Sequence, residues 1–416
     1  MLLRPFNLGR LGRASLSRSR NGWLLGGVIH ALSAGKNRSY SLGRSGRLSE
    51  QLHLSVVRAQ KAWEVSKESG LIVEFAADRP RIVDGSLVAR AAATSMTTNP
   101  DDPRQWFNNG SVVADLGQTR DLLRIVQVSS AGETWHRLKV LSGHPMDAGQ
   151  QLYVWFLYRS GSSGTCRILI DEAATAATNL QGPAGNLSII SGPSATIDQL
   201  NQMSLPDGRH LVQFRMTASV DAGSYSIGIG PGSSVPGEAV EVLAGNVNTG
   251  AQQVILEPTY TVDADNLTGP VPSGLDAGFS GVVRFRPEEF EGNTLFGMYR
   301  NLSGYWFRAY VHAEERVQVQ AYTPAGLEVN SPTNSAALSG EINTLAFRYF
   351  PNDLAFSLNG DAVRQDSSVQ VISGFDHLWL GRFGGLRELS GGIQDFQLSL
   401  ERFEDADLLR LSSGDV

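Results

Sequence analysis

Apolar and polar residues alternate with the period of a β-strand in the last third of the chain. Leucine, phenylalanine or tyrosine occupies every second position over 345–349 and again over 354–358. A Pro-Asn-Asp turn at 351–353 separates the two runs, and the second ends in Asn359-Gly360, a dipeptide that tolerates the positive φ angles of a type I′ turn. The pattern predicts strands joined by tight turns, each strand with one face toward a core.

Similar segments cover most of the remaining chain. Short apolar runs between glycine-rich and proline-rich breaks predict further strands at 122–126, 151–158, 166–170, 211–217, 224–229, 253–257, 282–285, 294–299, 305–311, 317–322, 378–381 and 393–400. A short helical pattern follows at 405–411. Over 48–63 a helical stripe and an alternating strand fit equally well, so periodicity leaves both interpretations open.

Composition supports a β-rich chain with more than one core. The 416 residues exceed one ordinary core, and 45 glycines, 17 prolines and 18% charged residues suit short strands and tight turns. Cys166 is the single cysteine, which excludes an intramolecular disulfide. No run of eighteen apolar residues occurs, so we expect no membrane span.

The N-terminus differs in charge from the rest of the chain. The first 47 residues hold nine of the 35 basic residues and none of the 41 acidic ones. Three interpretations are open: an export signal with a poor cleavage site at 31–34, an organellar transit peptide, or an anchor that becomes ordered against a partner surface. We favour the anchor, over residues 1–50, and expect it to attach through Arg4, Arg10, Arg13, Arg18, Arg20 and Trp23.

No motif for catalysis stands out. The seven histidines lack metal-site spacing, and the glycine-rich segment 228–232 lacks the Lys-Ser/Thr of a phosphate loop and is expected to be a turn. Three glutamates at 288, 289 and 291 are expected in a solvated loop. We therefore expect no enzyme and no cofactor, with calcium left open at Asp263, Asp265, Asp353 and Asp376.

Aromatic residues beside polar groups are the better candidates for a binding site. Aromatic rings stack on the C–H faces of sugars, while charged and amide side chains bond the hydroxyls. Because either face of a sandwich strand can be buried in a core or an interface, that alternative stays open for each candidate. The candidates are Trp379 with Asp376, His377 and Arg382, Trp306 with Arg308, and Trp155 with Tyr153.

The C-terminal segments carry a resemblance. "LAFRYFPNDLAFSLNGDAV", "HLWLGRFGG" and "LSGGIQDFQLSLERFEDADLLRLSS" follow one another in the chain. This order resembles the second half of a concanavalin A-like or laminin-G-like jelly roll and covers roughly residues 275–412. The resemblance concerns the fold more than any activity.

A second resemblance lies upstream, over residues 56–111. The residues that carry it are Arg58, Trp63, Gly70, Leu71, Ala76, Ala77, Pro80, Arg81, Gly85, Leu87, Thr98, Asn99 and Trp106. At these positions the segment is similar to the leader of phage head-spike-fibre and tail-fibre proteins, which opens a carbohydrate-binding-module-like jelly roll. It differs from that leader at positions 90 and 91, which are Arg and Ala where an acidic residue is usual.

Together the resemblances imply an all-β chain of two jelly-roll β-sandwiches in tandem after an extended N-terminal anchor. The expected parts are an anchor at 1–50, a leader or stalk at 51–100, a carbohydrate-binding-module-like jelly roll at 101–263, a linker at 264–278 and a concanavalin A/laminin-G-like lectin domain at 279–416.

The implied function is that of a phage or gene-transfer-agent spike or fibre protein on the virion surface. We expect a homotrimer that contacts other virion proteins through its N-terminus and host surface polysaccharide through its sandwiches, with no nucleic-acid partner. A secreted or surface-tethered bacterial adhesin, a polysaccharide depolymerase with a site between chains, and a structural virion spacer that binds no sugar are the alternatives.

Overall fold

The computed structural model describes most of the chain beyond its first 27 residues. It describes residues 28–414 apart from 34–37, 43–47, 51–54, 78–80, 85, 120–121, 173–176, 191, 263–265, 273, 288–292, 301–303, 313, 325, 382–388 and 390. The proposed anchor residues Arg4, Arg10, Arg13, Arg18, Arg20 and Trp23 lie outside the described residues.

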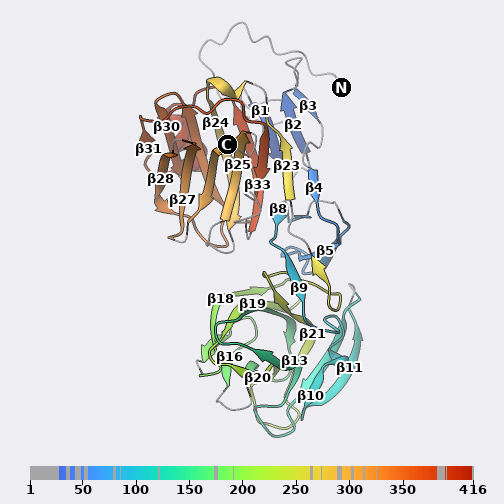
Figure 1. Cartoon of the computed structure of the whole chain (residues 1–416). Coiled ribbons are helices and arrows are strands. Elements are labelled where there is room, and N and C mark those ends of the chain that lie inside the picture. Colours follow the sequence, from blue (N-terminus) through green and yellow to red (C-terminus); the bar gives the residue numbers. More distant parts are fainter. Residues whose placement is uncertain are drawn as a thin grey trace. The chain divides into compact units, whose positions relative to one another are not determined.

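The described chain is all-β and forms two compact units, each a β-sandwich, which confirms the predicted fold class (Figure 1). Unit 1 takes its described residues from Met1–Val57, Asp78–Arg90 and Asp265–Val416, and unit 2 from Arg58–Ala77 and Ala91–Ala264. The chain therefore leaves unit 1 and returns to it twice, whereas the sequence analysis placed the parts one after another.

Unit 1 consists of two antiparallel sheets. In the first, the neighbouring strands are β3 (Leu48–Glu50), β2 (Arg38–Leu42), β1 (Val28–Ser33), β33 (Gly391–Ser399), β24 (Phe279–Pro287), β29 (Asn343–Phe350), β30 (Asp353–Leu358) and β31 (Arg364–Asp366). Strand β8 (Ser86–Ala89) also pairs with β33, and β7 (Arg81–Val83) pairs with β8. In the second, the order is β28 (Gly326–Ala336), β27 (Arg316–Thr323), β26 (Tyr305–Val311), β25 (Asn293–Arg300), β32 (His377–Leu380), β23 (Asn266–Pro270) and β4 (Ser55–Val57).

Two N-terminal segments cover one edge of strand β33. Residues 395–399 of β33 pair with β1, and residues 391–393 pair with β8. A strand edge left open would present a row of unpaired N–H and C=O groups. Residues expected in the anchor and the leader thus supply backbone hydrogen bonds to the C-terminal sandwich, a long-range pairing that local sequence patterns do not reveal.

The residues expected to form a linker also belong to unit 1. Strand β23 pairs with both β32 and β4, and the 3-10 helix η3 (Leu275–Ala277) buries Leu275 in the core. The helical interpretation of 48–63 is not what the described residues adopt, since β3, β4 and β5 (Ala62–Val65) lie there.

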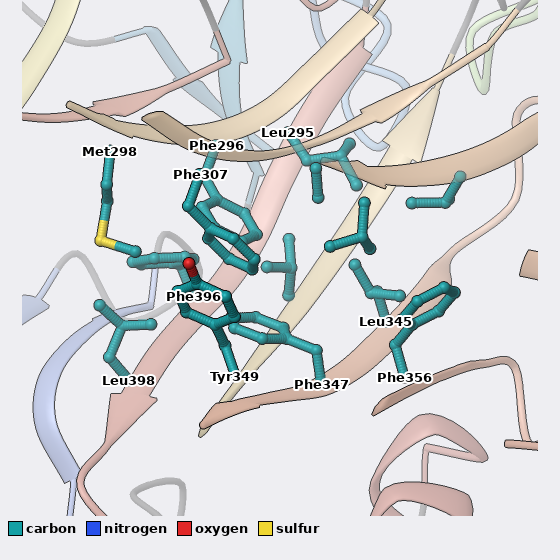
Figure 2. Packing of buried hydrophobic residues seen from close by; sticks show 14 of the residues in the cluster. Leu295, Phe296, Met298, Phe307, Leu345, Phe347, Tyr349, Phe356, Phe396 and Leu398 are labelled. Carbon is teal, nitrogen blue, oxygen red and sulfur yellow. The ribbon is translucent and has the colours of Figure 1, made fainter. Parts of the chain in front are cut away.

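Aromatic residues from both sheets fill the core of unit 1. Phe347 of β29 stacks on Phe296 of β25 with ring centroids 5.2 Å apart, and Phe307 of β26 stacks on Tyr349 at 4.4 Å. Figure 2 shows these side chains pointing toward one another between the sheets. The alternating residues at 345–349 and 354–358 face this core, as their spacing predicts.

The outer face of β29 and β30 is covered as well. The C-terminal helix α1 (Asp405–Ser412) buries Leu408 and Leu411 against Ala346 and Ala355. Arg348 fastens the helix, because its guanidinium contacts Asp405 at 2.5 Å and Asp353 at 2.8 Å. The predicted helix and the turn at Asn359-Gly360, where both φ angles are positive, are confirmed.

Unit 2 also consists of two antiparallel sheets, with one small hairpin. The first sheet contains β10 (Phe107–Asn109), β13 (Arg137–Met146), β20 (Ala222–Pro231), β15 (Cys166–Asp171), β16 (Thr178–Gly182) and β17 (Ser188–Ile190). The second contains β11 (Val112–Gln118), β12 (Arg124–Ser129), β21 (Ala239–Thr249), β14 (Gln151–Ser160), β19 (Arg209–Ala218) and β18 (Ala195–Ser204). Strand β9 (Ala93–Ser95) also pairs with β21, and β22 (Thr261–Val262) pairs with β9. Strands β5 and β6 (Ile72–Phe75) form the hairpin, and η2 (Pro103–Gln105) is a 3-10 turn.

The expectation of a turn at 228–232 is wrong for most of that segment. Gly228, Ile229 and Gly230 lie inside strand β20, which continues to Pro231. Ile229 faces the core of unit 2, whereas the two glycines lie on the opposite face. Glycine-rich sequence suggests a turn locally, but here it leaves one face of a central strand without side chains.

We expect Phe347→Ala to lower the free energy of unfolding of unit 1 by about 3–5 kcal/mol, because it removes a fully buried ring that contacts three other aromatic rings. Urea denaturation of the full chain measures the change. Leu338→Ala, at a side chain that is 56% exposed, is the control and should change the value by less than about 0.5 kcal/mol. Equal effects of the two variants would contradict the packing described here.

Removal of residues 1–57 should destabilise unit 1 selectively. The deletion takes away β1, β2, β3 and β4, and so uncovers edges of β33 and β23. In differential scanning calorimetry we expect the unfolding transition of unit 1 to move to lower temperature while that of unit 2 stays in place. An unchanged transition of unit 1 would show that these strands contribute nothing to its stability.

Candidate functional site

The strongest candidate site is the outer face of the second sheet of unit 1. Phe307, Ala309 and Val311 of β26 point into the core, so the residues between them lie on the opposite face. Strand β27 has the same arrangement, with Val317, Val319 and Ala321 inside. We call the resulting outer surface the polar–aromatic face, and it consists of Tyr299, Trp306, Arg308, Tyr310, Gln318, Gln320, Tyr322 and Trp379.

Arg308 lies at the centre of this face. Its guanidinium lies 4.6 Å from the centre of the Trp306 ring and 4.5 Å from that of Tyr310. Its Nε and Nη2 both donate to Oε1 of Gln320, at 2.9 and 2.6 Å. The side chain is 7% exposed, so this cation is held in one position by two rings and an amide.

Gln320 links Arg308 to neighbouring polar groups. Its Nε2 donates to the hydroxyl of Tyr310 at 3.1 Å and to Oδ1 of Asn330 at 2.8 Å. The Tyr310 hydroxyl in turn donates to Gln318. Because each group in the network has its partner, the side chains lose little conformational entropy when a ligand binds.

Cross-strand stacking fixes one end of the face. Trp306 pairs in register with Tyr322, and their rings are nearly parallel, with centroids 5.2 Å apart and 5° between the planes. Both side chains are half-buried and therefore remain partly accessible. Offset stacking of this kind contributes about 0.5–1.5 kcal/mol beyond the area that it buries.

Trp379 lies across the sheet from Arg308. Gly297 of β25 pairs with Arg308 on one side and Trp379 on the other, so only backbone separates the two side chains in that row. Two strand spacings put them about 10 Å apart. The indole Nε1 of Trp379 is buried and has no hydrogen-bond partner among the described residues.

Tyr299 packs beside Trp379, with ring centroids 5.3 Å apart. Burial raises the pKa of the Tyr299 phenol, and the positive charge of Arg308 offsets part of that rise. The phenol is therefore neutral at physiological pH. The face presents rings, amides and one fixed cation, which suits the recognition of hydroxyl groups better than proton transfer.

Asp376 and His377 lie at the start of β32, next to Trp379. Both are exposed, and Nδ1 of His377 lies 2.6 Å from Oδ1 of Asp376. His377 also pairs in register with Tyr299. The structure thus brings Trp379, Asp376 and His377 from one segment together with Trp306 and Arg308 from another, whereas Arg382 lies outside the described residues.

The candidate pair in unit 2 has a different environment. Trp155 is fully buried in a cluster with Trp63 of β5 and Val254, and Tyr153 is half-buried. Val154 and Phe156 face the other side, between the two sheets, so β14 is covered on both faces. The segment that carries Trp63 lies some ninety residues upstream, and for that reason the alternation at 153–156 does not reveal the cover.

The remaining candidates for metal binding and catalysis give no cluster in the described part of the chain. No group of three His, Cys, Asp or Glu side chains suited to a metal ion occurs there. Asp353 pairs with Arg348 and Arg402, and Asp376 with His377. Asp263, Asp265, Glu288, Glu289 and Glu291 lie outside the described residues. Within the same residues, no helix has the length and apolar character needed to cross a membrane.

Five ring or amide residues of the face escaped the sequence analysis: Tyr299, Tyr310, Gln318, Gln320 and Tyr322. The same phase argument that singled out Trp306 would have found four of them. Tyr310 has the phase of Trp306, and the residues at 318, 320 and 322 alternate with Val317, Val319 and Ala321. The alternation within one strand does not show which residues of the adjacent strands lie beside its side chains. Registers between β25, β26, β27 and β32 supply that information.

Comparison with known proteins gives similarity in fold only. No family model and no curated protein matches the chain. Among solved structures, domain 4 of AbnA, a GH43 extracellular arabinanase from Geobacillus stearothermophilus in complex with arabinotriose, is 12% identical with a TM-score of 0.32, over 36% of this chain and 73% of that one.

Two further structures are similar over more of the chain. Domains LG4-5 of the mouse laminin α1 chain are 14% identical with a TM-score of 0.27, over 80% of this chain and 96% of that one. Trypanosoma rangeli sialidase in complex with the inhibitor DANA is 10% identical with a TM-score of 0.30, over 91% and 67%. At these scores the similarities carry no argument about a ligand or a reaction.

Replacement of Trp155 tests its assignment to the core. We expect Trp155→Ala to lower the free energy of unfolding of unit 2 by about 3–5 kcal/mol, because the indole is fully buried. Trp135→Ala is the matched control: that side chain is 45% exposed, and we expect a change below about 1 kcal/mol. Chemical denaturation followed by circular dichroism measures both, and a stable Trp155→Ala chain would argue against burial.

Proposed function

We propose that this chain binds carbohydrate through the polar–aromatic face of unit 1. The observation that carries the proposal is the juxtaposition of Trp306, Tyr322 and Trp379 with the guanidinium of Arg308, which Gln320 holds in place, on one sheet face. Sugar rings stack on aromatic side chains through their C–H faces, and amide and guanidinium groups bond their hydroxyls. A preorganised surface of this kind suits a binding module.

We further propose that the chain acts on the virion surface as a head-spike or tail-fibre protein that attaches to host polysaccharide. Support comes from the likeness of residues 56–111 to phage leaders and from the basic N-terminal residues. In this proposal the chain is a homotrimer, its N-terminus contacts other virion proteins, and several weak sites act together. Immunogold labelling of particles from a producing culture tests the location, since a surface adhesin would label cells or the medium instead.

Binding to polysaccharides extracted from candidate host cells tests the site. With the full chain, we expect Trp306→Ala and Trp379→Ala each to weaken binding roughly fivefold or more, because each removes a stacking surface worth about 1 kcal/mol. Trp306→Phe keeps a ring and should give an intermediate affinity. Isothermal titration calorimetry or a glycan array provides the measurement.

Leu338→Ala serves as the control, because this exposed apolar residue of unit 1 is not part of the polar–aromatic face. Circular dichroism and thermal unfolding establish that all variants stay folded. Equal affinity of the wild type and both tryptophan variants would exclude the face as the binding site. A folded wild-type chain that binds none of the polysaccharides would favour a structural spacer.

A further inference from the structure

Unit 2 carries a cationic cluster on the outer face of the sheet that contains β13, β20 and β15. Leu138, Ile168 and Ile229 of these strands point into the core. Arg137, Lys139 and Arg167 alternate with core residues and therefore lie on the opposite face. We call the three side chains, with Asp171, the cationic cluster.

Among the residues that the structure describes, two of the three cations share one carboxylate. Nη2 of Arg137 lies 2.6 Å from Oδ2 of Asp171, and Nζ of Lys139 is 3.9 Å from the same oxygen. Arg167 is bonded by neutral groups instead: its Nε donates to Oδ1 of Asn179 at 2.9 Å and its Nη1 to the carbonyl of Thr134 at 3.3 Å. Positive charge is thus in excess at this surface.

Burial makes the excess charge costly. It lowers the pKa of Arg137, of Lys139 and of Arg167 from their ordinary values. The charge of Arg137 lowers the pKa of both neighbours further, and Asp171 compensates only in part. An anion bound here would relieve the mutual repulsion of the three cations.

The backbone of β20 gives Arg137 its position. A side chain at Gly228 would lie 2.9 Å from Cδ of Arg137, so only glycine leaves room for the arginine to lie flat along the sheet. Arg137 is 3% exposed, and its Nε is buried without a hydrogen-bond partner among the described residues. A buried donor left in this state is costly unless a ligand or a water molecule satisfies it.

An exposed aromatic ring flanks the cluster. Phe107 of β10 pairs in register with Lys139, whose Nζ lies 5.7 Å from the centre of the ring. Phe107 is 56% exposed, which is unusual for a side chain of its size. A ring beside excess positive charge suits a ligand that combines a C–H face with an anionic group.

Another arginine of unit 2 shows the contrast. Arg215 has a carboxylate of its own, since its Nε and Nη2 donate to the two oxygens of Asp198 at 2.8 and 2.6 Å. Its pKa is raised, chiefly by those hydrogen bonds, whereas that of Arg137 is lowered. The charge of Arg215 is therefore balanced by the carboxylate of Asp198. In the cationic cluster, by contrast, the described positive groups outnumber the negative ones.

We propose that the cationic cluster binds the carboxylate or sulfate group of an acidic saccharide, with Phe107 against the sugar ring. Lys139 and Arg167 supply the charge, and Arg137 is a positioning residue that orients Asp171 and spreads positive charge over the site. This site lies in unit 2 and does not depend on the polar–aromatic face of unit 1.

The test uses the full chain with oligogalacturonate and dextran sulfate as acidic probes, and unsulfated dextran and inorganic sulfate as controls. We expect the acidic saccharides to bind, with an affinity that falls as sodium chloride is raised. Lys139→Met should weaken binding about tenfold, the loss of one charge-assisted contact. Asp171→Asn should strengthen it, because the competing negative charge is removed, an effect that a purely structural role of the cluster would not produce.

Arg215→Gln is the matched control, since it removes one positive charge from the other sheet of unit 2 and should leave the affinity unchanged. Trp306→Ala should also bind the acidic probes like wild type, which separates this site from the one in unit 1. Equal affinities of wild type and Lys139→Met, or equal binding of dextran and dextran sulfate, would overturn the proposal. Inorganic sulfate that binds as tightly as the saccharides would overturn the saccharide as ligand.

Discussion

The edge of strand β33 is the constraint on which the organisation of the chain depends. Its outer N–H and C=O groups find partners in β1 and β8, two segments that lie more than three hundred residues earlier in the sequence. These pairings require that each of the two segments of unit 2 is followed in the sequence by a segment of unit 1. The two sandwiches therefore cannot be separated by a single cut, although each has its own core.

Unit 2 likewise depends on a segment that is distant in sequence from the rest of the unit. The β5 and β6 hairpin lies between two segments that belong to unit 1, yet it covers Trp155 and Leu157 on the outer face of β14. A sheet face rich in large apolar residues would otherwise be open to water. The interleaved chain is thus what allows both faces of the central strand of unit 2 to be apolar.

Sequence patterns predicted the local structure well and the long-range pairing poorly. Alternation at 345–349 and 354–358, the turn at Asn359-Gly360 and the helix near 405 depend on neighbouring residues, and all three were predicted. Partnerships such as β1 with β33, or Arg137 with Asp171 34 residues away, depend on register between distant strands. A one-residue change in register exchanges the two faces, so no local pattern fixes them.

For the candidate site, the alternation of residues along a strand predicted which side chains are accessible only where one face of that strand is in contact with solvent. Trp306 has the phase opposite to the core and is half-buried, whereas Trp155 has the phase opposite to Phe156 and is fully buried. Phase separates two faces, but the cover that another segment lays over one of them decides which is exposed. The expectation of a turn at Gly228 and Gly230 was wrong for a similar reason. These glycines leave space for the side chain of Arg137, which comes from another strand.

The two candidate surfaces differ in how they satisfy an arginine, and this difference predicts different ligands. Arg308 is enclosed by two rings and the amide of Gln320, so its charge is spread over neutral partners. Among the described residues, Arg137 shares the carboxylate of Asp171 with Lys139, which leaves a net attraction for anions. The first surface would therefore select neutral sugars and the second acidic ones, so each unit would have a specificity of its own.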